Sequence, residues 1–524
     1  MKLRLPRRRR GRLLAGAAAL AVVAGAGTLT ATAASGDAPA VHRQDRVLDM
    51  PGAAIDTSYF TASGNGVADG AKRPAVLLGH GFGGSKEDTR AQAEQLARDG
   101  YAVLTWSARG FGRSGGRIGL NDPEREVKDV SRIIDWLARQ PEVRLDADGD
   151  PRVGVSGASY GGAVSLLAAG YDRRVDAIAP QISYWNLADS LFPDGVFKKL
   201  WTGIFFTTGA AEGLQPSATA PETQDGRDAR PGTPAATGCG RFEPELCAMY
   251  ERVAVAGKPD AEARELLEKR SPSAVGDRIK VPTLIVQGQD DSLFPLGQAD
   301  AMARAIAANG APVAVDWAAG GHDAGMRESG RTQARVTSWF DHYLKGDEKA
   351  ATGPAFRVSR SGGIDSTDGE VQLRGATGER YPGLTSGPHP IALTGREQTF
   401  ANPAGATPPA LSALPGIGGQ LAAFGAGLSL DFPGQNARFE SAPLPAGLRI
   451  TGTPTVTLKV RSTAADGSAV LFGKVYDVGP DGRQQVLPSQ LVAPVRVENA
   501  GNGATVALRL PAIDHAVEAG HRLR

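Results

Sequence analysis

Ser159 lies at the centre of a Gly-x-Ser-x-Gly pentapeptide, Gly157-Ala158-Ser159-Tyr160-Gly161. An apolar run from Val153 precedes it, and a run of small and apolar residues from Gly162 to Leu167 follows it. This order is typical of a strand, a sharp turn and a helix, which strain the serine backbone and raise its hydroxyl above a sheet. The pattern predicts that Ser159 is a nucleophile that attacks carbonyl carbon.

A serine hydroxyl is too weakly acidic to attack unaided, so it needs an imidazole that accepts its proton and a carboxylate that orients the imidazole. When the nucleophile lies on such a turn, the acid and then the histidine follow it in the chain. His322 lies on a glycine-flanked loop after a predicted strand at 313–317, and we expect it to be the base. His342 falls within a predicted helix and is expected to pack or to be solvated there.

Two neighbouring carboxylates, Asp290 and Asp291, follow the predicted strand 283–287. The frame Gly-x-x-Asp-x-x-apolar-Pro places Asp291 three residues beyond Gly288, so Asp291 is preferred as the acid and Asp290 as a solvated neighbour. Asp323 is adjacent to the histidine, and a neighbouring residue rarely has the geometry to orient it.

A tetrahedral oxyanion needs two donors where negative charge develops. One is expected to be the backbone amide of Tyr160, and the other the amide of Phe82 in the glycine-rich loop 80–84, although that loop could also be an ordinary turn. The acidic run 146–150 has part of the spacing of a calcium loop but lacks its later ligands, so a polar turn is the better interpretation. The predicted chemistry requires no metal and no organic cofactor.

Short apolar runs alternate with helical patterns from Arg73 to about Asp347. This alternation predicts an α/β-hydrolase fold with a doubly wound parallel sheet, in a catalytic domain at 45–350. Strands are expected at 74–79, 101–106, 152–156, 175–179 and 283–287, and helices at 87–99 and 124–139. An aromatic-rich stretch at about 184–274 interrupts the alternation and is expected to form a cap over the catalytic face. The cap's aromatic residues would build its own core and also line a pocket.

Cys239 and Cys247 are the two cysteines of the chain, and both lie in the predicted cap. An oxidising compartment would let them close a small loop, so we expect a disulfide. Two free thiols or half of a metal site are the alternatives.

After residue 347 the helical periodicity ends. Residues 351–384 are expected to be a linker, and residues 385–524 a β-sandwich of the jelly-roll type, because runs such as 455–460, 470–476 and 505–510 alternate as half-buried strands do. The chain ends at Arg524 as though a strand had begun, so we expect this domain to be truncated.

The first 33 residues have the pattern of a signal peptide: seven basic and no acidic residues, an apolar run from Leu13 to about Ala26, and small residues up to Ala33. A membrane anchor is the alternative, but the run is shorter and less apolar than a spanning helix needs. The chain has a formal net charge of +2, so removal of this segment would leave −5. We therefore expect an exported protein that does not bind nucleic acid and is not stably inserted in a membrane.

The chain also resembles the Xaa-Pro dipeptidyl-peptidase and cocaine esterase family of serine hydrolases. The resemblance rests on the motifs at 106–116, 150–154, 159–162, 321–325 and 339–346, and in the second domain on those at 448–454, 474–478 and 519–523. It implies Ser159, Asp291 and His322 as the triad, and a jelly-roll domain after the catalytic domain. Several members use a tyrosine hydroxyl as the second oxyanion donor, where this chain has Phe82.

Three functions follow from these patterns. The leading hypothesis, which the resemblance implies, is removal of N-terminal Xaa-Pro dipeptides through an acyl-enzyme. The first alternative is an esterase or amidase that acts on small acyl compounds. The second is a catalytically inert protein whose β domain binds a glycan or a partner, which the intact set of Ser159, Asp291 and His322 disfavours.

Overall fold

The computed structural model describes residues 39–63, 71–210, 238–323, 325–364, 371–385, 387–406, 431–488 and 491–524. The predicted signal peptide at 1–33 and part of the predicted cap, 211–237, lie outside the described residues. All of the described residues belong to one compact unit.

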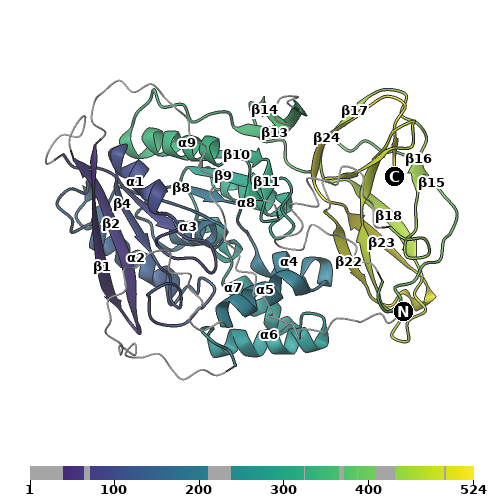
Figure 1. Cartoon of the computed structure of the whole chain (residues 1–524), viewed down its shortest axis with the longest axis horizontal. Helices are drawn as coiled ribbons and strands as arrows, with labels where there is room; N and C mark the ends of the chain where they lie inside the picture. Colours follow the sequence, from purple (N-terminus) through teal and green to yellow (C-terminus); the bar gives the residue numbers. More distant parts are fainter. Residues whose placement is uncertain are drawn as a thin grey trace, which may run out of the picture. The chain divides into compact units, whose positions relative to one another are not determined.

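A ten-stranded sheet forms the centre of the first part of the chain (Figure 1). In spatial order its strands are β1 (Ala40–Met50), β2 (Ala53–Ser63), β4 (Ala102–Trp106), β3 (Ala75–Gly79), β7 (Val153–Ala158), β8 (Val175–Gln181), β9 (Thr283–Gly288), β10 (Val313–Ala318), β13 (Phe356–Ile364) and β14 (Val371–Gly378). The seven strands that lie from β4 to β13 in this order are parallel, and β1, β2 and β14 are antiparallel to their neighbours.

Helices cover both faces of this sheet, as a parallel sheet requires. One face packs on α1 (Arg90–Arg98) and α9 (Ser329–Phe340), and the other on α2 (Glu126–Leu137), α3 (Tyr160–Tyr171) and α8 (Leu296–Ala308). The central strands are buried along their whole length because both their faces are covered. This arrangement is the α/β-hydrolase fold that the sequence predicts, with the nucleophile turn between β7 and α3.

The sheet is wider than the sequence predicts. The antiparallel hairpin β1–β2 adds two strands at one edge, beginning at Ala40 rather than at residue 45. At the other edge, β13 pairs in parallel with β10, and β14 pairs with β13. The predicted linker 351–384 is therefore wrong for about half of its length, because these two strands belong to the catalytic sheet.

Several helices follow one another in the chain between β8 and β9, where a single helix would continue the alternation of strands and helices; they lie together in Figure 1. They are α4 (Leu187–Leu191), η1 (Pro193–Gly195), α5 (Lys199–Ala210), α6 (Pro244–Ala256), α7 (Ala261–Lys269) and η2 (Pro272–Arg278). Aromatic and aliphatic residues of α4 to α7 share one apolar cluster with residues of the nucleophile turn and the Asp291 loop, including Tyr160 and Phe294. The cap core and the pocket lining are thus largely the same residues.

Residues from Leu393 onward are β-rich, and every strand pair described there is antiparallel. The strands are β15 (Leu393–Thr394), β16 (Glu440–Ser441), β17 (Leu448–Gly452), β18 (Thr455–Val460), β19 (Ala469–Gly473), β20 (Val475–Val478), β21 (Gln484–Leu487), β22 (Ala493–Val497), β23 (Ala504–Arg509), β24 (Ile513–Val517) and β25 (Arg522–Leu523). The jelly-roll topology stays a prediction. Among the residues that the structure describes, no helix is long and apolar enough to cross a membrane.

Candidate active site

The turn that carries Ser159 is strained and tightly packed. Ser159 has φ 56° and ψ −115°, a conformation that non-glycine residues rarely adopt. A methyl group on Gly157 or Gly161 would lie 2.6 or 2.2 Å from the carbonyl oxygen of Gly79. The ends of β3 and β7 and the start of α3 are therefore in direct backbone contact, which only glycine allows.

Asp291 and His322 lie together, as the sequence predicts for an acid and a base. His322 Nδ1 donates to Asp291 Oδ2 at 2.6 Å, and the Asp291 side chain is fully buried. Asp291 Oδ1 accepts the amides of Leu293 at 3.0 Å and Phe294 at 2.7 Å. These bonds fix the carboxylate, and the carboxylate fixes the histidine tautomer that leaves Nε2 free to accept a proton.

The neighbouring acids do not share this role. Asp290 accepts no hydrogen bond from His322, and burial raises its pKa. Asp323 instead accepts from Ser292, through the backbone amide and the hydroxyl, both at 2.7 Å. Burial raises the pKa of Asp323 to about 6 in spite of these bonds. Asp323 thus ties the His322 loop to the Asp291 loop.

The ring of His322 contacts two aromatic side chains. Its centroid lies 5.1 Å from that of Phe294 and 6.1 Å from that of Trp201, both edge-on. Trp201 comes from the cap and donates to Ser292 Oγ at 2.9 Å. His322 Nε2 is buried and has no hydrogen-bond partner among the described residues, which leaves it available for a substrate or a nucleophile.

Lys198 is a second link between the cap and the Asp291 loop. Its ammonium group donates to the carbonyl oxygens of Ser292 at 2.7 Å and Leu293 at 3.0 Å. Burial lowers the pKa of Lys198 to about 8, although the charges of Asp291 and Asp323 oppose the shift. A cationic cap residue thus lies close to the acid that orients His322.

A cavity of about 70 Å³ opens at Ser159. None of the described residues that line it carries a charge; they are Phe82, Leu120, Ser159, Tyr160, Tyr184, Leu187, Leu191, Thr202, Phe205, Phe206, Phe242, Leu246, Met249, Tyr250, Leu267 and Phe294. The cap contributes most of these side chains. The walls therefore favour an uncharged, apolar substrate group beside the serine.

The two predicted oxyanion residues flank this cavity. Phe82 and Tyr160 both line it, and their rings meet edge-on at 5.9 Å. Tyr160 is buried, and its hydroxyl accepts the amide of Asn121 at 2.9 Å, so this hydroxyl is engaged away from the pocket. The backbone amides of the two residues, rather than any side chain, are the candidate donors.

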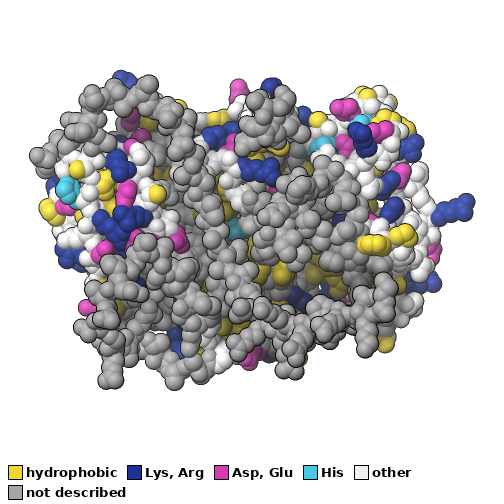
Figure 2. All heavy atoms as spheres, in the orientation of Figure 1, with side chains coloured by type: hydrophobic (Ala, Val, Ile, Leu, Met, Phe, Trp, Pro, Cys, Tyr) yellow, Lys and Arg dark blue, Asp and Glu magenta, His cyan; other side chains and the backbone are white. Residues whose placement is uncertain are grey.

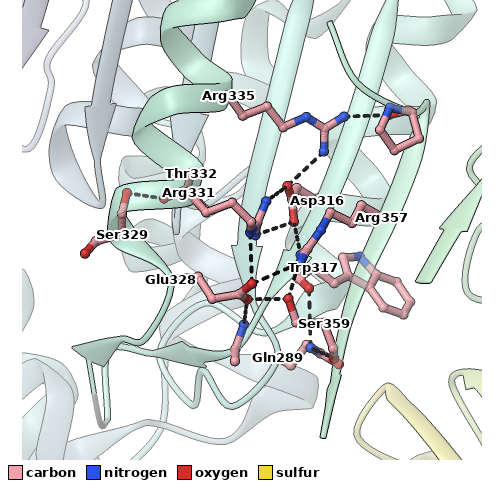
Figure 3. Close-up of polar contacts among 12 residues, drawn as sticks. Gln289, Asp316, Trp317, Glu328, Ser329, Arg331, Thr332, Arg335, Arg357 and Ser359 are labelled. Carbon is pink, nitrogen blue, oxygen red and sulfur yellow. Dashed lines mark hydrogen bonds and ion pairs between the residues drawn. The ribbon is translucent and has the colours of Figure 1, made fainter. Parts of the chain in front are cut away.

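A buried ionic network joins β10, α9 and β13 (Figure 3). Asp316 in β10 is fully buried and pairs with Arg331 at 2.7 Å and Arg335 at 2.8 Å. Glu328 accepts the amide of Ala319 at 3.0 Å and pairs with Arg357 at 3.0 Å. Burial opposes ionisation of Glu328, but hydrogen bonds from Ser359, Ala319 and Arg331 outweigh it and lower its pKa to about 2.

This network closes the base of the small hairpin that carries His322, formed by β11 (Gly320–Gly321) and β12 (Gly325–Met326). Gly320 has φ +99°, and a methyl group there would lie 2.0 Å from the carbonyl oxygen of Gly325. Gly320, two residues before His322, is therefore required by the hairpin itself.

Cys239 and Cys247 form a disulfide, with Cα atoms 5.5 Å apart. These sulfurs and Glu251 are the one cluster among the described residues with the arrangement of metal ligands, and the disulfide occupies both sulfurs.

Asp146 of the acidic run pairs with Arg152 at 2.8 Å, in the hairpin of β5 (Leu145–Ala147) and β6 (Asp150–Pro151), as a polar turn would. Figure 2 shows basic and acidic side chains interspersed on the visible face.

Comparison with known proteins places the chain in a family. Residues 67–320 match the model of the X-Pro dipeptidyl-peptidase (S15 family), and residues 420–524 match the model of the X-Pro dipeptidyl-peptidase C-terminal non-catalytic domain. The chain belongs to the X-Pro dipeptidyl-peptidase family.

Individual relatives of this S15 chain match over shorter stretches. Thiohydrolase AneE of Aspergillus aculeatus is 33% identical over 124 residues, 23% of this chain and 36% of that protein. Quorum-quenching protein AidA of Acinetobacter baumannii is 33% identical over 114 residues, 21% of this chain and 36% of that protein. The chain thus spans about a third of the length of these relatives. Acylaminoacyl peptidase of Pyrococcus horikoshii shares 16% identity over 60% of this chain and 42% of its own, with a TM-score of 0.39.

The sequence patterns did not reveal several residues that surround the site in this S15 protein. Trp201 lies in the aromatic stretch that predicts the cap, and Ser292 directly follows Asp291, so both had a signal in their positions. Asn121 and Ser183 carry none, because they are single polar residues in loops whose partners lie far away in the chain.

Proposed function

We propose that the protein hydrolyses acyl bonds through a covalent acyl-enzyme on Ser159. His322 Nε2 accepts the proton of the Ser159 hydroxyl, the serine oxygen attacks the carbonyl carbon, and the amides of Tyr160 and Phe82 stabilise the oxyanion. His322 then protonates the leaving group, and water releases the acid by the same steps in reverse. The observation that carries the proposal is the 2.6 Å bond between Asp291 and His322, which leaves His322 Nε2 without a partner among the described residues.

The substrate we propose is a peptide from which an N-terminal Xaa-Pro dipeptide is released. Family membership supports this choice. The uncharged walls of the cavity at Ser159 also suit a proline ring.

A second candidate is an esterase or amidase that acts on uncharged acyl groups. None of the described residues that line the cavity has a carboxylate to pair with the free α-ammonium of a peptide. A buried ammonium without such a partner would be costly to bind, so blocked or non-peptide acyl groups would suit this part of the pocket better.

Three chromogenic substrates separate the two candidates. Gly-Pro-p-nitroanilide and succinyl-Gly-Pro-p-nitroanilide share the proline and the leaving group but differ in the free amine, and p-nitrophenyl butyrate offers a plain acyl group. Turnover of the first alone supports the dipeptidyl-peptidase. Equal turnover of the first two, or turnover of the ester alone, would exclude it. Ser159→Ala is the control, and a failure of Ser159 to react with a fluorophosphonate would overturn the enzyme mechanism itself.

We also propose that the protein acts outside the cytoplasm. The basic and apolar pattern of residues 1–33 and the pairing of Cys239 with Cys247 support this location. Fractionation of cells that express the full chain, with mass spectrometry of the mature N-terminus, tests it. An uncleaved chain found only in the cytoplasm would contradict the proposal.

A further inference from the structure

Each proposed oxyanion donor is the N–H of a peptide group whose carbonyl oxygen accepts a hydrogen bond from a buried side chain. In a trans peptide the C=O of one residue and the N–H of the next point in opposite directions. A partner that fixes the Ser159 carbonyl therefore aims the Tyr160 amide, and a partner that fixes the Gly81 carbonyl aims the Phe82 amide.

Ser183 holds the first of these planes. Its hydroxyl donates to the carbonyl oxygen of Ser159 at 2.8 Å, and the amide of Ala163 donates to the same oxygen at 3.1 Å. Ser183 is buried, with 1% of its surface exposed. Its own amide donates to Gln287 Oε1 at 3.2 Å, and the fully buried Gln287 is anchored in turn on the Phe294 carbonyl.

The backbone around Ser183 is built to bring it to this position. Ile182 has φ 38°, which is strained for a β-branched residue, and its amide donates to the Val286 carbonyl at 2.7 Å. On the facing helix, a methyl group on Gly162 would lie 2.8 Å from Ser183 Cβ and 3.0 Å from its Oγ. A strained turn and a glycine thus both serve the close approach of Ser183 to the nucleophile turn.

His80 holds the second plane. Its Nδ1 donates to the Gly81 carbonyl oxygen at 2.7 Å, which also accepts the amide of Gly84 at 3.1 Å. His80 Nε2 accepts the amide of Ala108 at 2.9 Å, so the two partners define one neutral tautomer. The ring is 3% exposed, and burial lowers the pKa of His80, which keeps it neutral.

We propose that Ser183 and His80 are positioning residues that aim the Tyr160 and Phe82 amides at the oxyanion. Neither side chain lines the cavity at Ser159, so neither touches substrate there. They act through the two peptide planes alone. This inference rests on the roles proposed above for Ser159 and the two amides.

Ser183→Ala is the test, and Ser156→Ala is its matched control. Ser156 is equally buried and donates to the Ala179 carbonyl at 2.7 Å, which belongs to no proposed oxyanion peptide. Both variants lose one buried hydroxyl bond to a carbonyl, so both should lose similar stability. Only Ser183→Ala should lower kcat, by about tenfold, with KM within twofold of wild type, since complete loss of a donor costs about 10²–10³.

Inhibition by a trifluoromethyl ketone provides the second readout, because its hemiketal oxyanion occupies the same hole. Its affinity should fall with kcat/KM in Ser183→Ala and stay unchanged in Ser156→Ala. His80→Ala should behave as Ser183→Ala does, and it keeps the proposal testable should one variant fail to fold. A folded Ser183→Ala or His80→Ala with unchanged kcat and inhibitor affinity would overturn the positioning roles. Activity that survives Ser159→Ala would instead overturn the proposed function.

Discussion

Replacement of Asp291 by Asn tests the proposed catalytic acid at nearly constant shape. Oδ1 of Asp291 accepts two backbone amides, from Leu293 at 3.0 Å and Phe294 at 2.7 Å. An Asn carboxamide must turn its oxygen to these two donors, because its NH₂ group would otherwise face them. The NH₂ group then points at His322 Nδ1, which has to accept. The ring proton consequently moves to Nε2, the atom that has to accept the proton of Ser159.

We expect a large loss of kcat, because the amides of Leu293 and Phe294 fix the orientation of the Asn side chain and thereby impose the wrong tautomer on His322. An Asp-to-Asn change of this kind costs about 10⁴-fold in kcat in a serine protease, which corresponds to roughly 5.5 kcal/mol of activation free energy. We expect a similar loss for Asp291→Asn on p-nitrophenyl butyrate or Gly-Pro-p-nitroanilide, whichever the wild type turns over. The thermal unfolding midpoint should fall only modestly, since the shape and the two amide bonds to Oδ1 are retained and only the His322 amide, 3.3 Å from Oδ2, loses its acceptor.

Asp290→Asn is the matched control, because its side chain accepts no hydrogen bond from His322. Its kcat should remain within a few-fold of wild type. Asp291→Asn activity within tenfold of wild type, with correct folding shown by circular dichroism, would refute the tautomer argument. A larger loss in Asp290→Asn than in Asp291→Asn would reassign the acid.

Three further predictions concern stability. Burial raises the pKa of Glu126 from 4.5 to about 7, so the folded state binds this proton more tightly than the unfolded chain does. The free energy of unfolding of wild type, measured with guanidinium, should therefore fall by up to about 3 kcal/mol relative to that of Glu126→Gln as pH rises from 4.5 to 7. A difference between the two proteins that does not change with pH would contradict this prediction. Asp316→Asn should destabilise the catalytic domain by about 3–5 kcal/mol, because buried arginines lose their partner, whereas the more exposed Asp146→Asn should cost under about 1 kcal/mol; equal losses would argue against this. Replacing Cys239 and Cys247 by Ser should lower the free energy of unfolding by about 2.5 kcal/mol, because the disulfide no longer restricts this short loop in the unfolded chain. An unchanged midpoint of guanidinium unfolding would contradict this prediction.

The nucleophile turn and the Asp291 and His322 loops could be predicted because local sequence determines them. Gly157 and Gly161 are required by backbone contacts within a few residues of Ser159, and Asp291 and His322 each follow an apolar strand. Chain order then limits the choice of base to very few residues. Such features depend on neighbours in sequence, and sequence patterns capture them.

The sheet edges could not be predicted, because their strands lack apolar runs. β13 carries Arg357 and Ser359, whose burial becomes favourable only beside Asp316 and Glu328. β2 buries Asp56, which pairs with Lys86 at 2.7 Å. In each case a charged partner distant in the chain makes a polar strand compatible with the interior. No pattern within the strand itself reveals that partner.

The residues that cleave the substrate and the residues that select it come from different segments of the chain, and are therefore encoded by different stretches of the gene. Ser159, Asp291 and His322 are fixed by loops at the ends of sheet strands, whereas cap residues such as Phe206 and Met249 form the walls of the cavity. A mutant library limited to residues 187–210 and 244–267 would therefore vary which substrates fit the cavity and leave the catalytic residues unchanged. Trp201 and Lys198 are the positions that such a library should spare, because they bind the cap to the catalytic loops.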